Sequence, residues 1–394
     1  MTPMIRKPFS RPSSRIQAVA PSATKVMADR AAGIHNCVSL GQGVPGFAPP
    51  PHVMEAVQQM LVDNPTISRY TLQTGMPQLR ERLSEYLLAE KGVKADPVHE
   101  ICVTVGGMEA LLASILAVVD PGDEVLLPSP TYASYTEQVL LAGGVPVFVP
   151  LTKQWGLDLA GLRAAVTQKT KAILLCNPGN PTGNVYSADE IRALCELAVA
   201  NNIVLIIDEA YDYIVYDDTT ILNPLSVDAY RDHVIAIGSL SKKYCLTGWR
   251  VGWVAAARQW MEHITKVHDA ATICAPTISQ CAALAALNGD QQWVATCCRE
   301  LAKKKEVCCS RLDRLAPHFS YVAPKGAFYI MGKYHFTTDN SQQTAHRLLD
   351  ETGVITVPGG SFGQGGEGHL RLSFGGETAE INESFDRIER WLGA

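Results

Sequence analysis

The chain has 394 residues, of which 47% are hydrophobic and 19% are charged, a composition that indicates a globular protein with a sizeable buried core. A net charge of −5 and a pI near 6.1 give no reason to expect nucleic acid as a partner. Because no apolar run reaches the roughly 18 residues that a membrane span requires, we expect no membrane association.

The N-terminal segment is basic and rich in proline. Its first acid is Asp29, so residues 1–28 faintly resemble an organellar transit peptide, but Pro3, Pro8 and Pro12 break any helix there. The 11 cysteines have no CxxC spacing and look like the reduced thiols of a cytosolic protein. We therefore expect a cytoplasmic protein with a basic arm and no metal site, even at the paired cysteines Cys297, Cys298, Cys308 and Cys309.

The middle of the chain alternates between strand-like and helical patterns, which predicts an α/β fold. One stretch between strands, 187–201, has apolar residues at helical spacing. A long helical stretch from about 290 to 316 then leads into a smaller α+β region. The strand-like runs predict a mainly parallel, seven-stranded sheet covered on both faces, and they lie near 101–105, 124–128, 146–150, 172–176, 203–207, 234–238 and 251–256.

Polar motifs follow these runs where open α/β sheets bind their ligands. The first run gives way to Gly106, Gly107 and a helical pattern. Glycines let backbone amides approach an anion and a helix N-terminus adds partial positive charge, so this turn is suited to a phosphate. The second run is followed by SPTYASY, from Ser129 to Tyr135, where an aromatic ring can stack on a planar ligand. Alone, each pattern also fits an ordinary turn or a core tyrosine.

Three later motifs combine into a cofactor site. NPGNPTG starts at Asn177, DEAY starts at Asp208, and SLSKKYCLTGWR ends at Arg250. A carboxylate beside hydroxyls, an amine and a guanidinium suits an anionic, ring-bearing cofactor, and we infer pyridoxal 5'-phosphate. A lysine would hold its aldehyde as a Schiff base, and Asp208 would keep its ring nitrogen protonated.

The same stretch supplies donors for a phosphate dianion, namely Ser239, Ser241 and Arg250. Composition alone does not choose between the adjacent lysines Lys242 and Lys243 as the Schiff-base residue.

A last motif, HLRLSF, lies near the C-terminus. Its alternation puts Arg371 on the face opposite Leu370 and Leu372, and a buried guanidinium needs an anionic partner. A substrate carboxylate and a structural ion pair both satisfy that need.

From about residue 36 to the C-terminus, these motifs together resemble the fold-type I, class I/II aminotransferases, the aspartate aminotransferase superfamily. The resemblance implies a homodimer with shared active sites. It also implies an N-terminal arm joining the small domain (1–45), a large pyridoxal-phosphate-binding domain (46–290) and a small C-terminal domain (291–394).

The resemblance also assigns roles to single residues. The Schiff-base lysine follows SxS and precedes the phosphate arginine by eight positions, which selects Lys242. Asn180 and Tyr211 would contact the phenolic oxygen of the cofactor, and Arg371 would bind the α-carboxylate of the substrate. The other positions implied are the phosphate-facing amides of Gly107 and Met108, the stacking ring of Tyr132, Gly43 beside the substrate, and Tyr70, which would reach the phosphate in the neighbouring subunit.

The activity implied is a ping-pong transfer. The freed Lys242 acts as the general base, a 2-oxo acid leaves, and the nitrogen passes to a second 2-oxo acid, which family habit makes 2-oxoglutarate. In one aspartate-type subgroup a lysine stands where this chain has Met108, and an aspartate is frequent at Gly46. The first departure favours apolar, aromatic or broad amino donors over strict aspartate specificity.

Three alternatives stay open at this point. One is an aspartate-type aminotransferase. Another is a pyridoxal-phosphate lyase of the same fold, either a carbon-sulfur lyase or an aminocyclopropane-carboxylate synthase. The least favoured is a regulatory domain that binds the cofactor, because the 35 N-terminal residues are too short and proline-rich for a DNA-binding module.

Overall fold

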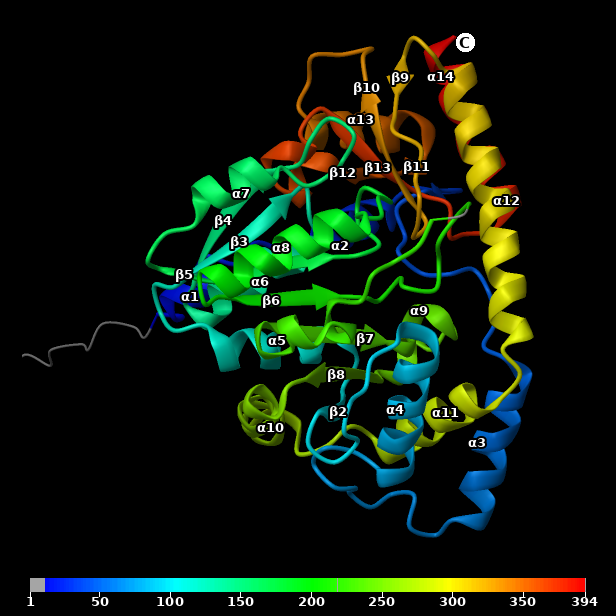
Figure 1. Ribbon diagram of the computed structural model, residues 1–394. Coiled ribbons are helices and arrows are strands. Elements are labelled where there is room, and N and C mark those ends of the chain that lie inside the picture. Colours follow the sequence, from blue (N-terminus) through cyan, green and yellow to red (C-terminus); the bar gives the residue numbers. More distant parts are fainter. Residues whose placement is uncertain (1–10, 218, 394) are drawn as a thin grey trace, which may run out of the picture.

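The computed structural model describes residues 11–217 and 219–393, so the start of the basic arm, with Pro3, Arg6, Lys7 and Pro8, lies outside the described residues. At its centre is a seven-stranded sheet in the order β2-β8-β7-β6-β5-β3-β4 (Figure 1). The strands are β2 (Ile101–Thr104), β3 (Glu124–Ser129), β4 (Val145–Pro150), β5 (Thr170–Cys176), β6 (Val204–Asp208), β7 (Val234–Ser239) and β8 (Gly252–Ala256).

The sheet is mainly parallel, as the sequence predicted. Neighbouring strands from β4 through β7 pair in parallel, and β8 alone runs antiparallel to both of its neighbours, β2 and β7. All seven predicted runs became strands of this sheet, with ends shifted by at most two residues. Long apolar runs suit such strands because helices bury both faces of a parallel sheet.

Alternate residues of one strand show that both faces are covered. Ile206 of β6 packs into one hydrophobic cluster, whereas Leu205 and Ile207 pack into another. Figure 1 shows helices on either side of the sheet. The first cluster includes α5 (Gly107–Val118), α6 (Ala133–Ala142) and α10 (Arg258–Thr272), and the second includes α3 (Pro51–Asp63), α4 (Pro77–Lys91), α7 (Leu159–Ala165), α8 (Ala188–Ala200) and α11 (Thr277–Asn288).

The C-terminal region forms a second, smaller layer. It contains a four-stranded sheet in the order β12-β13-β10-β9, and the long helix α12 (Gln292–Arg314) runs beside both layers (Figure 1). The remaining elements are β9 (Phe319–Ser320), β10 (Tyr329–Tyr334), α13 (Ser341–Thr352), β11 (Val354–Ile355), β12 (Val357–Pro358), β13 (His369–Ser373) and α14 (Thr378–Leu392).

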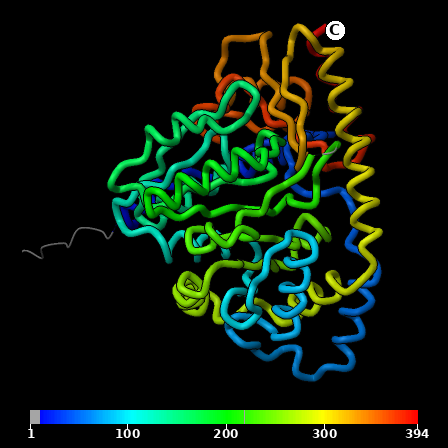
Figure 2. Tube along the Cα trace, in the orientation of Figure 1, coloured from blue at the N-terminus to red at the C-terminus, as the bar shows by residue number. Residues whose placement is uncertain are grey.

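The N-terminal segment joins this smaller layer. After α1 (Ser14–Gln17) and α2 (Ala23–Ala31), strand β1 (Val38–Ser39) pairs in parallel with β11. In Figure 2 the blue segment accordingly reaches the orange and red C-terminal region. The ion pair between Arg30 and Asp350, with a nitrogen–oxygen distance of 2.5 Å, also ties α2 to α13. This path brings residues from the beginning of the chain to the ends of the central strands.

Two classes of feature are absent from the described ranges. Between residues 11 and 393, apart from residue 218, no helix is long and apolar enough to cross a bilayer. The same part of the chain contains no cluster of histidine, cysteine or acidic side chains that could hold a metal ion.

Candidate active site

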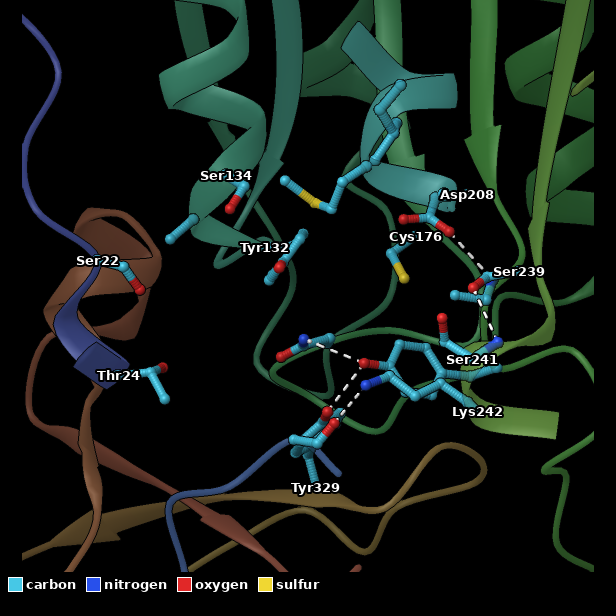
Figure 3. Close-up of a pocket in the computed structure, with 18 of the residues that line it drawn as sticks. Ser22, Thr24, Tyr132, Ser134, Cys176, Asp208, Ser239, Ser241, Lys242 and Tyr329 are labelled. Atoms are coloured by element: carbon cyan, nitrogen blue, oxygen red, sulfur yellow. Dashed lines mark hydrogen bonds between the residues drawn. The ribbon is translucent and has the colours of Figure 1, made fainter. Parts of the chain in front are cut away.

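The C-terminal ends of β5, β6 and β7 surround a cavity of about 370 Å³. The N-terminus of α5, the α9 turn (Leu240–Lys243) and β13 complete its walls, and α2 lies across from the strand ends. Figure 3 shows this arrangement, with Ser22 and Thr24 on the side opposite Asp208 and Ser239. The strand ends therefore bring together motifs that are far apart in the sequence, as expected of an open α/β sheet.

Asp208 is a buried carboxylate at the end of β6. It accepts hydrogen bonds from the Tyr135 hydroxyl at 2.9 Å and from the Ala210 amide at 3.0 Å. Burial raises the pKa of Asp208 to about 6, and these hydrogen bonds only partly oppose the rise. A buried acid of this kind calls for a cationic partner, such as a protonated ring nitrogen.

The adjacent lysines face different surroundings. Lys242 lines the cavity and its Nζ donates a hydrogen bond to the Gly43 carbonyl. Burial, together with the positive charges of Arg371 and Arg250, lowers the pKa of Lys242 to about 8. Lys243 instead lines a second cavity, where its Nζ donates to the Tyr86 hydroxyl at 3.1 Å. The structure thus distinguishes Lys242 from Lys243 by the cavity that each side chain lines, which composition alone could not do.

A cradle for an anion lies at the start of α5. Gly106 has φ +76°, and a Cβ there would come within 2.7 Å of the Arg250 guanidinium. Arg250 itself has φ 50°, which is unusual for a residue with a side chain, and its Nη1 donates to the Thr247 carbonyl at 2.9 Å. Ser239 and Ser241 line the same wall. Glycine amides, hydroxyls and a guanidinium beside a helix N-terminus form a site that fits a phosphate.

Asn180 and Tyr211 meet on another wall. The Asn180 amide donates to the Tyr211 hydroxyl at 3.5 Å, and the hydroxyls of Tyr211 and Tyr329 lie 2.8 Å apart. Burial raises the pKa of Tyr211 well above its ordinary value, so this phenol stays protonated and able to donate. Gly43 adjoins this group, since a Cβ on it would come within 2.7 Å of the Tyr329 hydroxyl.

Arg371 is a buried guanidinium without a carboxylate partner in the part of the chain that the structure describes. Its Nη2 donates to the Gly41 carbonyl at 2.6 Å and its Nη1 to the Asn180 Oδ1 at 3.2 Å. Its Nε is buried and has no hydrogen-bond partner among the described residues. Arg371 also lines the cavity, and a cation this buried needs an anion, which a carboxylate bound in the cavity would supply.

Two further expected residues line the cavity. The ring of Tyr132 lies edge-on to Tyr135, with centroids 5.5 Å apart, and Met108 lies at the start of α5. Tyr70 is the exception among the expected site residues, because it does not line this cavity and is 76% exposed. Those that do are Gly43, Gly107, Met108, Tyr132, Asn180, Asp208, Tyr211, Ser239, Ser241, Lys242, Arg250 and Arg371.

Sequence reasoning missed several residues of the cavity. Thr24 and Lys25 belong to α2 and Ser22 directly precedes it, and no local pattern in that stretch indicates that it folds back over the strand ends. Tyr135 does not line the cavity but donates to Asp208; it lies within the SPTYASY motif, and its burial against Asp208 is a tertiary contact. Tyr329 lies at the start of β10 in an apolar run, which is consistent with its burial but does not identify its partner.

Comparisons with known proteins agree with this geometry. A family model described as aminotransferase class I and II matches residues 35–388. The aspartate aminotransferase of Pyrococcus abyssi is 35% identical over 384 residues, covering 96% of this chain and 98% of that protein. The aromatic-amino-acid aminotransferase 2 of Thermococcus litoralis is 33% identical with the same coverage. A solved structure of Thermus thermophilus aspartate aminotransferase with maleate superposes with a TM-score of 0.91 at 32% identity, covering 97% of this chain and 100% of that one.

Proposed function

The chain belongs to the class I and II aminotransferase family and is an amino-acid aminotransferase, and from this premise we propose that its cavity holds pyridoxal 5'-phosphate. Members of this family depend on that cofactor. One observation carries the proposal: a single cavity joins an amine of lowered pKa, a buried carboxylate and a cradle that fits a phosphate. When bound, the cofactor supplies an aldehyde that takes up the amino group and a ring that withdraws electrons from the substrate Cα.

The residues of the cavity would divide the binding of the cofactor among them. Asp208 would pair with the ring nitrogen, and the donors Asn180 and Tyr211 would hold the phenolic oxygen. Tyr132 would cover one face of the ring and limit the access of water. The phosphate would lie among the Gly107 and Met108 amides, Ser239, Ser241 and Arg250.

Lys242 and Arg371 would act on the substrate. An amine with a pKa of about 8 is substantially neutral near that pH, so Lys242 would accept the proton that leaves Cα and return it to the cofactor side. Arg371 would fix the α-carboxylate through two nitrogens, which orients the Cα–H bond toward Lys242. Gly43 would leave room for the substrate beside the Tyr329 hydroxyl.

We propose a broad range of amino donors, including apolar and aromatic ones, with 2-oxoglutarate as the acceptor. Met108 presents an apolar side chain at the start of α5, whereas Lys25 of α2 offers a cation to a side-chain carboxylate. A cavity with an apolar and a cationic side chain suits an amino donor with an uncharged side chain in one half-reaction and a dicarboxylate acceptor in the other. The names of the relatives, which act on aspartate or on aromatic amino acids, are in keeping with this range.

We also propose a cytoplasmic homodimer with shared sites. Tyr70 is exposed in a segment with other exposed apolar residues, and such a patch is typical of an interface. The free state of every cysteine is in keeping with a reducing compartment. Residues 1–45, 46–290 and 291–394 would act as the arm, the large domain and the small domain.

A single-turnover experiment tests the activity. The purified protein, loaded with pyridoxal phosphate, is mixed with a panel of amino acids in the absence of any 2-oxo acid, and its absorbance spectrum is followed. We expect one conversion of the aldehyde form to the aminated form per site, at a rate that ranks the donors. Steady release of ammonia with the aldehyde form retained would instead identify a lyase, and a protein that takes up no cofactor would contradict the proposal.

A further inference from the structure

A second cavity of about 320 Å³ lies behind the active site, on the opposite side of the loop after β6 and of α9. Its walls include charged residues that each follow an active-site residue in the sequence. The three neighbouring pairs are Asp208 with Glu209, Tyr211 with Asp212, and Lys242 with Lys243. At all three places, one side chain faces the active site and the next faces this second cavity.

Lys91, the last residue of α4, is at the centre of the charges in the second cavity. Its Nζ lies 2.5 Å from the Glu209 Oε2 and also contacts the Asp212 Oδ2. The side chains of Lys91 and Glu209 are 8% and 1% exposed, so this pair is almost entirely removed from water. Asn223 donates to both oxygens of Glu209, at 2.8 and 2.9 Å, and fixes that carboxylate further.

Lys243 enters the same group from α9 through an aromatic side chain. Its Nζ donates to the Tyr86 hydroxyl at 3.1 Å, and that hydroxyl donates to the Asp212 Oδ2 at 3.3 Å. The ammonium also lies 4.5 Å from the centroid of the Tyr86 ring, a favourable cation–π position. We call Lys91, Glu209, Asp212 and Lys243 the Lys91 cluster, in which two positive charges balance two negative ones.

The cluster joins two short segments that carry active-site residues to one long helix. Residues 209–213 are a turn after β6, α9 is a helix of 4 residues, and both carry active-site side chains. Tyr86 and Lys91 belong to α4, a helix of 15 residues that packs on the sheet, and Figure 1 shows α4 beside α9. Charges buried in a low dielectric resist displacement, because any separation leaves an uncompensated charge. The long helix therefore fixes the two short segments.

We propose that the Lys91 cluster is a positioning device that holds Asp208, Tyr211 and Lys242 in the arrangement that binds pyridoxal phosphate. The proposal rests on the proposed function of the first cavity. No member of the cluster lines that cavity, so the cluster acts through the backbone that its members share with the active-site residues. A merely structural cluster would stabilise the fold without affecting the cofactor.

The test compares two cluster variants with a matched control. Lys91→Met removes the central charge, and Glu209→Gln is a milder change that keeps an acceptor for Asn223. The control is Glu100→Gln, which breaks the half-buried ion pair of Glu100 with Arg231, at 2.9 Å, near the opposite ends of the strands. Glu209→Gln also carries the test if Lys91→Met does not fold.

Two readouts are measured in each variant: the dissociation constant of pyridoxal phosphate, and amide hydrogen exchange of the cofactor-free protein. For the cluster variants, we expect about a tenfold weaker affinity, the lower end of what supporting hydrogen-bond partners contribute at metal sites. We also expect faster exchange in residues 206–214 and 239–246, with neither change in Glu100→Gln. If both cluster variants match the control in affinity and exchange, the cluster is only structural. If the unmutated protein does not bind pyridoxal phosphate, it is the proposed function that fails.

Discussion

At the scale of single residues, Lys242 and Lys243 face different cavities, which predicts which of the two lysines binds the cofactor. In the cofactor-loaded protein, borohydride reduction should attach the cofactor mass to a peptide at Lys242, because of the two adjacent lysines only this one faces the first cavity. Lys242→Ala should lose the attachment and at least about 10²-fold in the rate of transamination, since the proposed general base is removed. Lys243→Ala, whose side chain contacts Tyr86 instead, should keep the attachment even where its affinity for the cofactor falls. Peptide mass spectrometry checks both variants, and attachment at residue 243 would refute the assignment.

The raised pKa of Asp208 predicts how the stability of the cofactor-free protein depends on pH. Its pKa is raised in the folded state from 3.8 to about 6, so the folded state binds the proton more tightly than the unfolded state. The stabilising effect of that proton is complete below pH 4 and is lost as the pH rises through 6. Asp208→Asn removes the buried charge, and we expect it to raise the free energy of unfolding by up to about 3 kcal/mol at pH 8.

Urea unfolding of the cofactor-free proteins between pH 5 and pH 8 measures this difference. The advantage of Asp208→Asn should grow across that range, whereas Asp189→Asn, at a side chain that is 96% exposed, should show no such trend. An advantage for Asp208→Asn that is the same at every pH would contradict the raised pKa. The variant should transaminate poorly, because an amide cannot supply the negative charge that the ring nitrogen needs.

The sequence predicted about half of the residues that line the cavity, and many of these lie in short motifs at strand ends. Asp208 and Arg250 could be assigned from such motifs, whereas Lys242 was chosen over Lys243 only through the family resemblance, and the fold shows that the two lysines face different cavities. The α2 residues could not be found, since their place depends on β1 pairing with β11 more than 300 residues later. Tyr70 remains a prediction, because its expected role needs a second subunit.

At the scale of elements, the turn between β2 and α5 predicts how the phosphate is recognised. Gly106→Ala would place a methyl group 2.7 Å from the Arg250 guanidinium, which must then move. We expect the dissociation constant of pyridoxal phosphate to rise at least about tenfold through the loss of a charge-assisted hydrogen bond. The affinity for pyridoxal, which lacks the phosphate, should change little, and fluorescence titration with both compounds measures the difference.

Gly122→Ala is the matched control for this turn. Gly122 also has a positive φ, +92°, but a Cβ there meets no atom within 4 Å. Both variants should therefore lose about 1 kcal/mol of stability to backbone strain. If Gly122→Ala weakens pyridoxal phosphate binding as much as Gly106→Ala does, strain rather than the displaced arginine is the cause.

The elements themselves were predictable where one pattern dominated. The stretch 187–201 became α8, because Ser187 and Glu190 cap each other's backbone amides at its start and apolar residues follow at helical spacing. Pairing directions were less accessible. The apolar run of β8 resembles its neighbours, and only the fold shows that it is antiparallel to β2 and β7. Such a strand is buried on both faces whether it runs parallel or antiparallel to its neighbours, so its composition does not reveal its direction.

At the scale of the whole molecule, residues 61–72 predict a contact between subunits. This segment carries Leu61, Val62, Tyr70 and Leu72, which are 59%, 81%, 76% and 58% exposed. Exposed apolar side chains so close together are typical of an interface. A two-fold dimer uses the same patch on both subunits, so each subunit would lend its Tyr70 to the other's site.

Hybrid dimers distinguish a shared site from a merely adjacent one. In Tyr70→Ala every site would lack the proposed phosphate contact, and in Lys242→Ala every site would lack the proposed base. If the sites are shared, a hybrid of the two variants has one site that contains both Lys242 and the partner's Tyr70. Random reassociation of equal amounts makes half of the dimers hybrids, so about a quarter of the unmutated activity should return. Activity measured before and after unfolding and refolding of the mixture checks this. A mixture no more active than its separate components would mean that Tyr70 does not complete the neighbouring site.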